Sequence, residues 1–163
     1  MAAYGKNSDA YLLGYLGCSR AGLVHVPINF ALTGGELAYL LEDSGATTVL
    51  VDPALEGTLA ATAVPVEHTV VLRDAPGALV ERVRSGEVPG IDVEVSDTDL
   101  VQLLYTSGTT SRPKGAMMTH RALVHEYVSA IIALDFTPDD EPLHAMPLYH
   151  SAGMHVFLMP YLM

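Results

Sequence analysis

The sequence predicts an α/β fold in which helices alternate with mostly parallel strands. Short β-branched apolar runs recur along the 163 residues, and segments with apolar side chains at helical spacing separate them. Half of the residues are hydrophobic, which is enough to fill a sizeable core. Because the apolar runs are short and take turns with helices, we expect a parallel sheet that is covered on both faces.

The first element is expected to be a helix, with no strand before it. Asn7 or Ser8 can cap its amino end, and Gly22 stands where a left-handed stop is favoured. A β-branched run follows over 23–28 and predicts the first strand. The helix face expected to pack against the sheet consists of Leu12, Tyr15, Leu16 and Ser19.

The alternation continues with a second helix that Thr33 caps and Gly45 ends, before a strand over 47–51. The apolar face of this helix carries Leu37, Leu40 and Leu41. Two more helices and a strand between them are expected over 53–63, 69–72 and 76–84, in the order helix, strand, helix.

The segment 85–99 is rich in glycine, proline and acidic residues, which indicates an exposed connection. We therefore expect two portions of one truncated large domain, 1–95 with the alternating elements and 96–163 with the motifs described below. The elements expected in the second portion are a strand, a turn-rich loop, a short strand and a helix, over 101–105, 106–115, 116–119 and 121–134.

The carboxyl end is the apolar run 154–163, with neither a polar cap nor a turn after it. Because a complete domain rarely finishes on its own core, we expect a piece of a larger protein, and this end could support self-association or a homo-oligomer. Met146 and the large apolar side chains of this run are interpreted as core in preference to an acyl-pocket lining. They are Met146, Met154, Phe157, Leu158, Met159 and Met163.

Charge and composition exclude several classes of function. Nineteen acidic against eight basic residues give a net charge of -11, so the surface should repel nucleic acid. The apolar runs are shorter than the ~20 residues of a membrane-spanning helix, so an integral membrane protein is not expected. Cys18 is the single cysteine, which excludes an internal disulfide and is compatible with a reducing, cytoplasmic location.

The loop YTSGTTSRPKG, residues 105–115, is the strongest chemical signal. Hydroxyl side chains and exposed backbone N–H groups can surround phosphate oxygens, and Lys114 adds a mobile positive charge. Residues 105–134 carry a net charge of +2 in an otherwise acidic chain. Because Lys114 is followed by Gly115 rather than Ser or Thr, this is not a Walker loop.

With these residues in view, YTSGTTSRPKGAMMTH resembles the phosphate-loop signature of AMP-forming adenylating enzymes, which include acyl-CoA synthetases. A second segment, PLYHSAGM at 147–154, resembles the family's motif of Pro-Leu, an aromatic residue and His. AGLVHVPIN and LAYLLEDSGA are also similar to segments that precede the loop in acyl-CoA synthetases. Ser111 departs from the glycine that is most common at its position.

The resemblance implies that the full-length parent activates a carboxylic acid, fatty or otherwise hydrophobic, with ATP and transfers the acyl group to coenzyme A. It places His150 beside the acyl-adenylate pocket and Mg²⁺ mainly on elements outside these residues. No structural metal is expected. The residues that the resemblance assigns to the ATP phosphates are Thr106, Ser107, Gly108, Thr109, Thr110 and Lys114.

Two alternatives remain open at this point. The parent could be an adenylation domain that loads a carrier protein, or the chain could be a non-catalytic module that binds phosphate or a partner. Because the resemblance also implies catalytic elements that these 163 residues lack, we expect the chain alone to be inactive. The remaining histidines of the second portion have no comparable motif around them; they are His120, His125, His144 and His155.

Overall fold

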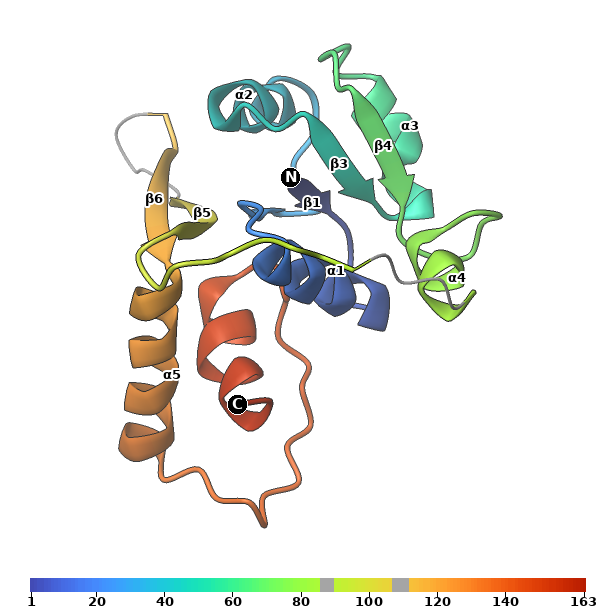
Figure 1. Ribbon diagram of the computed structural model, residues 1–163. Helices are drawn as coiled ribbons and strands as arrows, with labels where there is room; N and C mark the ends of the chain where they lie inside the picture. The colour runs from blue at the N-terminus through green and yellow to red at the C-terminus, as the bar shows by residue number, and fades with distance from the viewer. Residues whose placement is uncertain (86–89, 107–111) are drawn as a thin grey trace.

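The computed structural model describes residues 1–85, 90–106 and 112–163 (Figure 1). Its centre is a four-stranded parallel sheet with the strand order β2–β1–β3–β4. The expected alternation of helices and parallel strands is therefore confirmed. The four strands are β1 (Ala2–Tyr4), β2 (Val26–Ile28), β3 (Thr48–Val51) and β4 (His68–Val71).

Strand β1 corrects the expectation that the chain leads directly into a helix. Ala2 lies opposite Val26 of β2 and Val49 of β3, so β1 occupies the interior of the sheet. Three residues are too short to show an alternating pattern. The strand exists because both of its edges are paired, which depends on residues more than twenty positions away.

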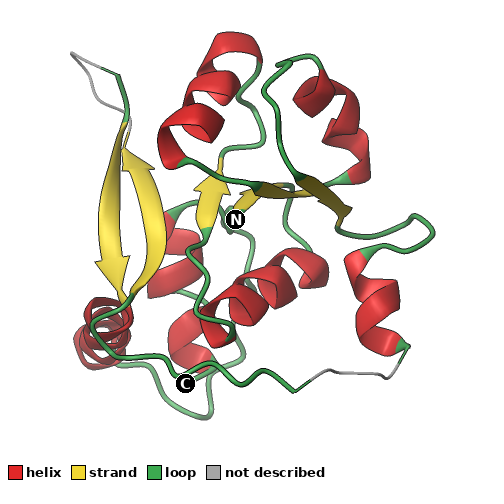
Figure 2. Ribbon diagram, turned by 45° about the horizontal axis from the view of Figure 1, so that its top comes forward, coloured by secondary structure: helices red, strands yellow, loops and turns green. Residues whose placement is uncertain are grey.

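Helices cover both faces of this sheet (Figure 2). On one face lie α2 (Gly34–Ser44) and α3 (Glu56–Ala60), and on the other lie α1 (Asp9–Arg20) and α4 (Leu79–Arg84). Side chains alternate along the strands, so Tyr4 packs with α2 whereas Ala3 packs with α1. The expected helix over 53–63 is divided into a 3₁₀ turn, Pro53–Leu55, and α3.

Of the two expected caps of helix α1, Asn7 and Ser8, the structure uses Ser8, whose Oγ accepts a hydrogen bond from the Tyr11 N–H (3.1 Å). Its predicted packing face is confirmed in part: Tyr15 is buried and Leu12 packs against the core, whereas Leu16 is 37% exposed. Gly14 explains the difference: a Cβ there would lie 2.6 Å from Leu50 Cδ1, so the helix approaches the sheet along its small residues. The buried residues of α1 are Ala10, Tyr11, Gly14, Tyr15 and Cys18.

Helix α2 matches its predicted apolar face and its predicted end, and Thr33 stands at its amino end as expected but, within the described residues, makes no side-chain capping hydrogen bond. Leu37, Leu40 and Leu41 are buried against the sheet, and Gly45 ends the helix in the left-handed region at φ 62°. That conformation favours glycine, which is why the stop could be located from the sequence.

The second portion contains an antiparallel hairpin of β5 (Leu100–Thr106) and β6 (Lys114–Thr119), followed by α5 (His120–Leu134). A parallel bridge between His25 and Gln102 joins the hairpin to the edge of the sheet at β2. In this bridge the His25 N–H donates to Val101 O (2.8 Å), and the Leu103 N–H donates to His25 O (3.0 Å). The division into 1–95 and 96–163 stays a prediction.

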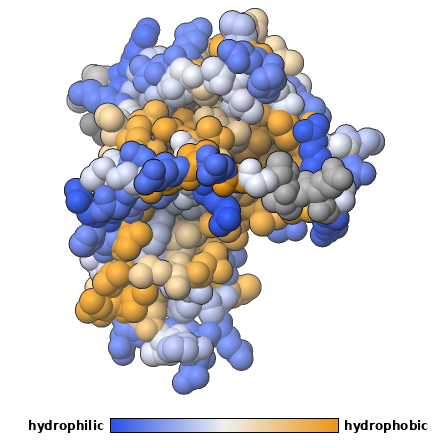
Figure 3. Space-filling view, viewed as in Figure 1, coloured by the Kyte–Doolittle hydropathy of each residue, from blue (hydrophilic) through white to orange (hydrophobic). Residues whose placement is uncertain are grey.

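The carboxyl-terminal segment returns to the α1 side of the sheet, where Met154 is buried as expected for a core residue. It forms a π-helical turn, Ala152–Val156, and a 3₁₀ turn, Met159–Tyr161. Met146, Phe157 and Met163 are exposed, contrary to the core interpretation. Self-association through this end stays a prediction. Apolar side chains also gather on the visible surface in the region of α5 (Figure 3). The exposed apolar residues of this helix include Val124, Val128 and Ile132. Within the described residues, no helix has the length and apolar character needed to cross a membrane.

Candidate functional site

The hairpin brings the two ends of the predicted phosphate loop together. Thr106 is the last residue of β5 and Lys114 the first of β6, and the two are paired in register with both side chains exposed. The other predicted phosphate-binding residues lie outside the described residues, as does the departure at 111. They are Ser107, Gly108, Thr109 and Thr110.

Helix α2 holds both arms of this loop, through two residues that lie one helical turn apart. On the β5 arm, the Tyr105 hydroxyl donates to Asp43 Oδ2 (2.6 Å). On the β6 arm, the Tyr39 hydroxyl donates to Pro113 O (2.9 Å), and the Arg112 guanidinium carbon lies 5.2 Å from the centroid of the Tyr39 ring. Burial, followed by the contact with Asp43, raises the pKa of Tyr105, which therefore stays a neutral donor.

Gly115 allows this arrangement on the opposite strand. A Cβ at this position would lie 3.3 Å from the Tyr105 ring, so a larger residue would push the ring away from β6. The two hydrogen bonds from the arms to Asp43 and Tyr39 of α2 together form a brace. Beside this brace is a surface hollow of about 470 Å³, lined by Tyr39, Arg112, Pro113 and further residues of α2. The motif glycine thus has a packing role next to the loop.

The positive charge predicted around the loop is more local than the sequence suggests. Arg121 lies 3.7 Å from Asp97, and both side chains are exposed. Asp43 adds a carboxylate to the loop's base, although it lies far away in the sequence. The cationic character therefore comes from Arg112 and Lys114, both exposed at the β6 arm.

His150 lies in an exposed turn, and a backbone hydrogen bond to its ring indicates which ring nitrogen carries the proton. The Ala152 N–H donates to His150 Nδ1 (3.2 Å), so Nδ1 is an acceptor and the proton is on Nε2. The neighbouring Tyr149 ring packs edge-on against Phe30, with centroids 5.5 Å apart. Nε2–H is therefore available as a hydrogen-bond donor to a ligand.

The turn around His150 is tight because of Gly153. A Cβ on Gly153 would lie 2.2 Å from Pro147 O, closer than any side chain permits. The His150 N–H donates to the same carbonyl oxygen (3.1 Å). The glycine of the PLYHSAGM segment is thus required for the close approach of two backbone segments.

A chain of buried polar side chains connects these motifs behind the surface. Gln102 Nε2 donates to His25 Nδ1 (3.1 Å), and His155 Nε2 donates to Gln102 Oε1 (2.7 Å). His155 Nδ1 then accepts from the Tyr127 hydroxyl (3.0 Å), whose oxygen lies 3.1 Å from the Tyr15 hydroxyl. This series of hydrogen bonds therefore links β5, which leads into the phosphate loop, to the segment that carries His150.

His25 and His155, the two histidines in this series of hydrogen bonds, are buried and neutral. Loss of hydration lowers the pKa of His25 to about 3 and that of His155 to about 4. Sequence reasoning found no role for His155, because its partners come from other elements. Gln102 was the available signal, since it is a polar residue within an otherwise apolar strand.

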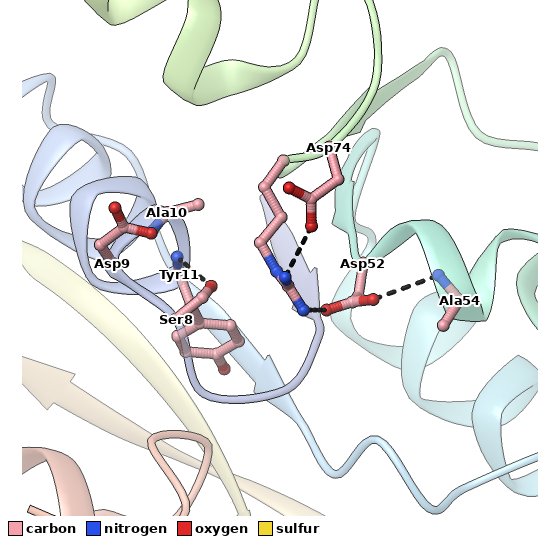
Figure 4. A network of polar contacts seen from close by, with 8 residues as sticks. Ser8, Asp9, Ala10, Tyr11, Asp52, Ala54 and Asp74 are labelled. Atoms are coloured by element: carbon pink, nitrogen blue, oxygen red, sulfur yellow. Dashed lines mark hydrogen bonds and ion pairs between the residues drawn. The ribbon is translucent and has the colours of Figure 1, made fainter.

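The described residues offer no cluster of three or more His, Cys, Asp or Glu that could hold a metal ion. One buried carboxylate, Asp52, has a structural explanation (Figure 4). Its Oδ2 lies 3.2 Å from Arg73 Nη2, and its Oδ1 accepts from the Ala54 N–H (3.1 Å) at the start of a 3₁₀ turn. Arg73 also pairs with Asp74 (2.6 Å).

Comparison with known proteins places these features in context. The family described as AMP-binding enzyme matches residues 1–163. A feruloyl-CoA synthase of Amycolatopsis sp is 38% identical over an alignment of 168 positions, which covers 100% of this chain and 32% of that protein. The fatty acid–[acyl-carrier-protein] ligase ScoC of Streptomyces coeruleorubidus is 33% identical over an alignment of 165 positions, which covers 94% of this chain and 30% of that protein.

The fold is likewise similar to solved structures. The crystal structure of ATP-bound MatB from Rhodopseudomonas palustris superimposes with a TM-score of 0.84 and 35% sequence identity. The match covers 99% of this chain and 32% of MatB. The present chain thus spans about a third of the length of the proteins that it resembles.

Proposed function

The chain belongs to the AMP-binding enzyme family, and from that membership we propose that it forms part of an AMP-forming acid–thiol ligase. The whole protein activates a carboxylic acid with ATP, releasing pyrophosphate, and transfers the acyl group from the acyl-adenylate to coenzyme A. The observation that carries this proposal is the hairpin that sets Thr106 opposite Lys114 and is braced on α2.

The first half-reaction brings a carboxylate close to a polyanion, so its barrier depends on charge. Fixed donors around the phosphates reduce the repulsion without reorganising during the reaction. We assign this role to the hydroxyls of the loop and to Lys114, whose position at the start of β6 is held by the brace. His150 Nε2–H serves as a donor towards the carboxylate or the acyl-adenylate.

The acid is proposed to be fatty or otherwise hydrophobic. Names of relatives include a feruloyl-CoA synthase and a fatty acid–[acyl-carrier-protein] ligase, so both the acid and the acceptor differ among similar proteins. Coenzyme A is the acceptor we favour, and a carrier protein is the alternative that ScoC supports. Mg²⁺ binds mainly to elements outside this chain, which alone is inactive. A cytoplasmic location agrees with the single buried thiol of Cys18.

The proposal is tested by carboxylate-dependent ATP–pyrophosphate exchange in the full-length protein across a panel of acids. Lys114→Ala should lower the exchange rate by about 10²-fold, the scale seen when a charge-stabilising group is removed. Lys6→Ala is the matched control, because Lys6 is also exposed and lies outside the site. Exchange that is undiminished in Lys114→Ala would refute the role of that lysine. ATP binding without exchange for any acid would instead support the non-catalytic alternative.

A further inference from the structure

We propose that Asn7 is a positioning residue that fixes the segment carrying His150, an inference that rests on the proposed function. Asn7 Nδ2 donates to Met146 O (2.8 Å), and the Leu148 N–H donates to Asn7 Oδ1 (2.8 Å). The side-chain amide thus holds the backbone on both sides of Pro147, although the partners are 139 and 141 residues apart in sequence.

The chemistry of the amide suits this position. The backbone around Pro147 offers one acceptor, at Met146, and one donor, at Leu148, and an amide side chain supplies the complementary donor and acceptor together. A carboxylate would match the Leu148 N–H but would repel the Met146 carbonyl oxygen. Asn7 therefore acts on this segment as a neighbouring strand would.

Asn7 is itself held by rigid elements. It lies between β1, which is paired on both edges, and Ser8, which caps α1. Its position is thus set by the centre of the sheet. Because Asn7 holds the segment around Pro147, that segment is fixed relative to the sheet. A site residue such as His150 needs such support to keep its geometry.

The path from Asn7 to His150 is short. Leu148 is only 6% exposed and is anchored in the core, and the His150 N–H donates to Pro147 O (3.1 Å). Gly153 packs against the same carbonyl. Release of Pro147 would therefore move the backbone amide of His150 and, with it, the direction of Nε2–H.

Asn29 provides a matched control, because it is the other asparagine in the chain. It also follows a strand of the sheet, but within the described residues its Oδ1 accepts a local hydrogen bond, from the Ala31 N–H (3.0 Å). Its replacement by alanine therefore removes a local hydrogen bond and none of the hydrogen bonds that hold Met146 and Leu148.

The first test uses hydrogen exchange, which does not depend on activity. In the full-length protein, Asn7→Ala should remove the exchange protection of the Leu148 amide and also lower that of the His150 amide by tenfold or more. Asn29→Ala should leave both unchanged. Protection of the His150 amide that is the same in Asn7→Ala and the wild type would overturn the proposal. Asn7→Asp, which keeps the acceptor for Leu148, serves the same comparison if Asn7→Ala fails to fold.

The second test asks whether Asn7 acts through His150. Asn7→Ala should lower kcat/KM for the acid by about 10²-fold, the scale of a small displacement at a reacting centre, with Asn7→Asp in between. The double variant Asn7→Ala/His150→Ala should be no slower than His150→Ala alone. Additive losses in the double variant would overturn the proposal. If the wild type shows no ATP–pyrophosphate exchange with any acid, the proposed function fails. Amide hydrogen exchange still decides the role of Asn7 in that case.

Discussion

The buried hydrogen bonds of Gln102 predict a large loss of folding stability when Gln102 is replaced with leucine, a residue of similar size. The substitution leaves His25 Nδ1 without its donor and His155 Nε2–H without its acceptor, and the atoms concerned are buried. An unsatisfied buried polar group costs about 1–3 kcal/mol, so the expected loss is about 2–6 kcal/mol of the free energy of unfolding. That is a large part of the roughly 5–15 kcal/mol that stabilises a typical domain.

Urea unfolding followed by far-UV circular dichroism measures this loss in the purified protein. Met117→Leu on the paired strand is the control, because Met117 is 72% exposed and its replacement should change the free energy by less than about 0.5 kcal/mol. Gln102→Leu should lower the urea midpoint, whereas Met117→Leu should not. A loss below about 1 kcal/mol for Gln102→Leu would refute the assigned hydrogen bonds.

Two other substitutions or conditions probe the same core. Gly153→Ala should lower the melting temperature by several degrees and weaken carboxylate-dependent exchange, because its Cβ would lie 2.2 Å from Pro147 O; an unchanged thermal scan would contradict the close approach. The free energy of unfolding should also fall as the pH drops below about 6.5. In the folded state His25 has a pKa of about 3 and His155 a pKa of about 4, so in this pH range both bind protons in the unfolded chain but not in the folded protein. The free energy of unfolding should change by up to about 1.4 kcal/mol per pH unit for each histidine. Urea unfolding between pH 7 and 5 measures this dependence, and an equal pH dependence in the wild type and His155→Gln would contradict the contribution of His155.

The brace from α2 shows how charge is redistributed by folding. Along the chain, the loop and the following helix are cationic while their surroundings are acidic. In the fold, Asp43 meets Tyr105 at the base of the loop, and the exposed cations are left at the β6 arm. A carboxylate held by a neutral hydroxyl beneath the loop keeps the strand in place without removing the positive charge of Lys114.

Local patterns in the sequence were sufficient for much of the fold. The Ser8 cap, the Gly45 stop and the leucine face of α2 each depend on a few neighbouring residues, so they could be predicted and are confirmed. The phosphate-loop and PLYHSAGM motifs could be identified for the same reason, because their residues are contiguous. The roles assigned to them remain proposals.

Other features depend on contacts between residues that are far apart in the sequence. The three residues of β1 become a strand only between β2 and β3, and α1 turns Gly14 to the sheet because Leu50 is there. The Asn7 contacts at Pro147 and the hydrogen bonds of Gln102 join segments separated by 53 to 141 residues. Periodicity describes which side of an element is apolar, but it carries no information on which distant element will meet that side, so packing had to settle these contacts.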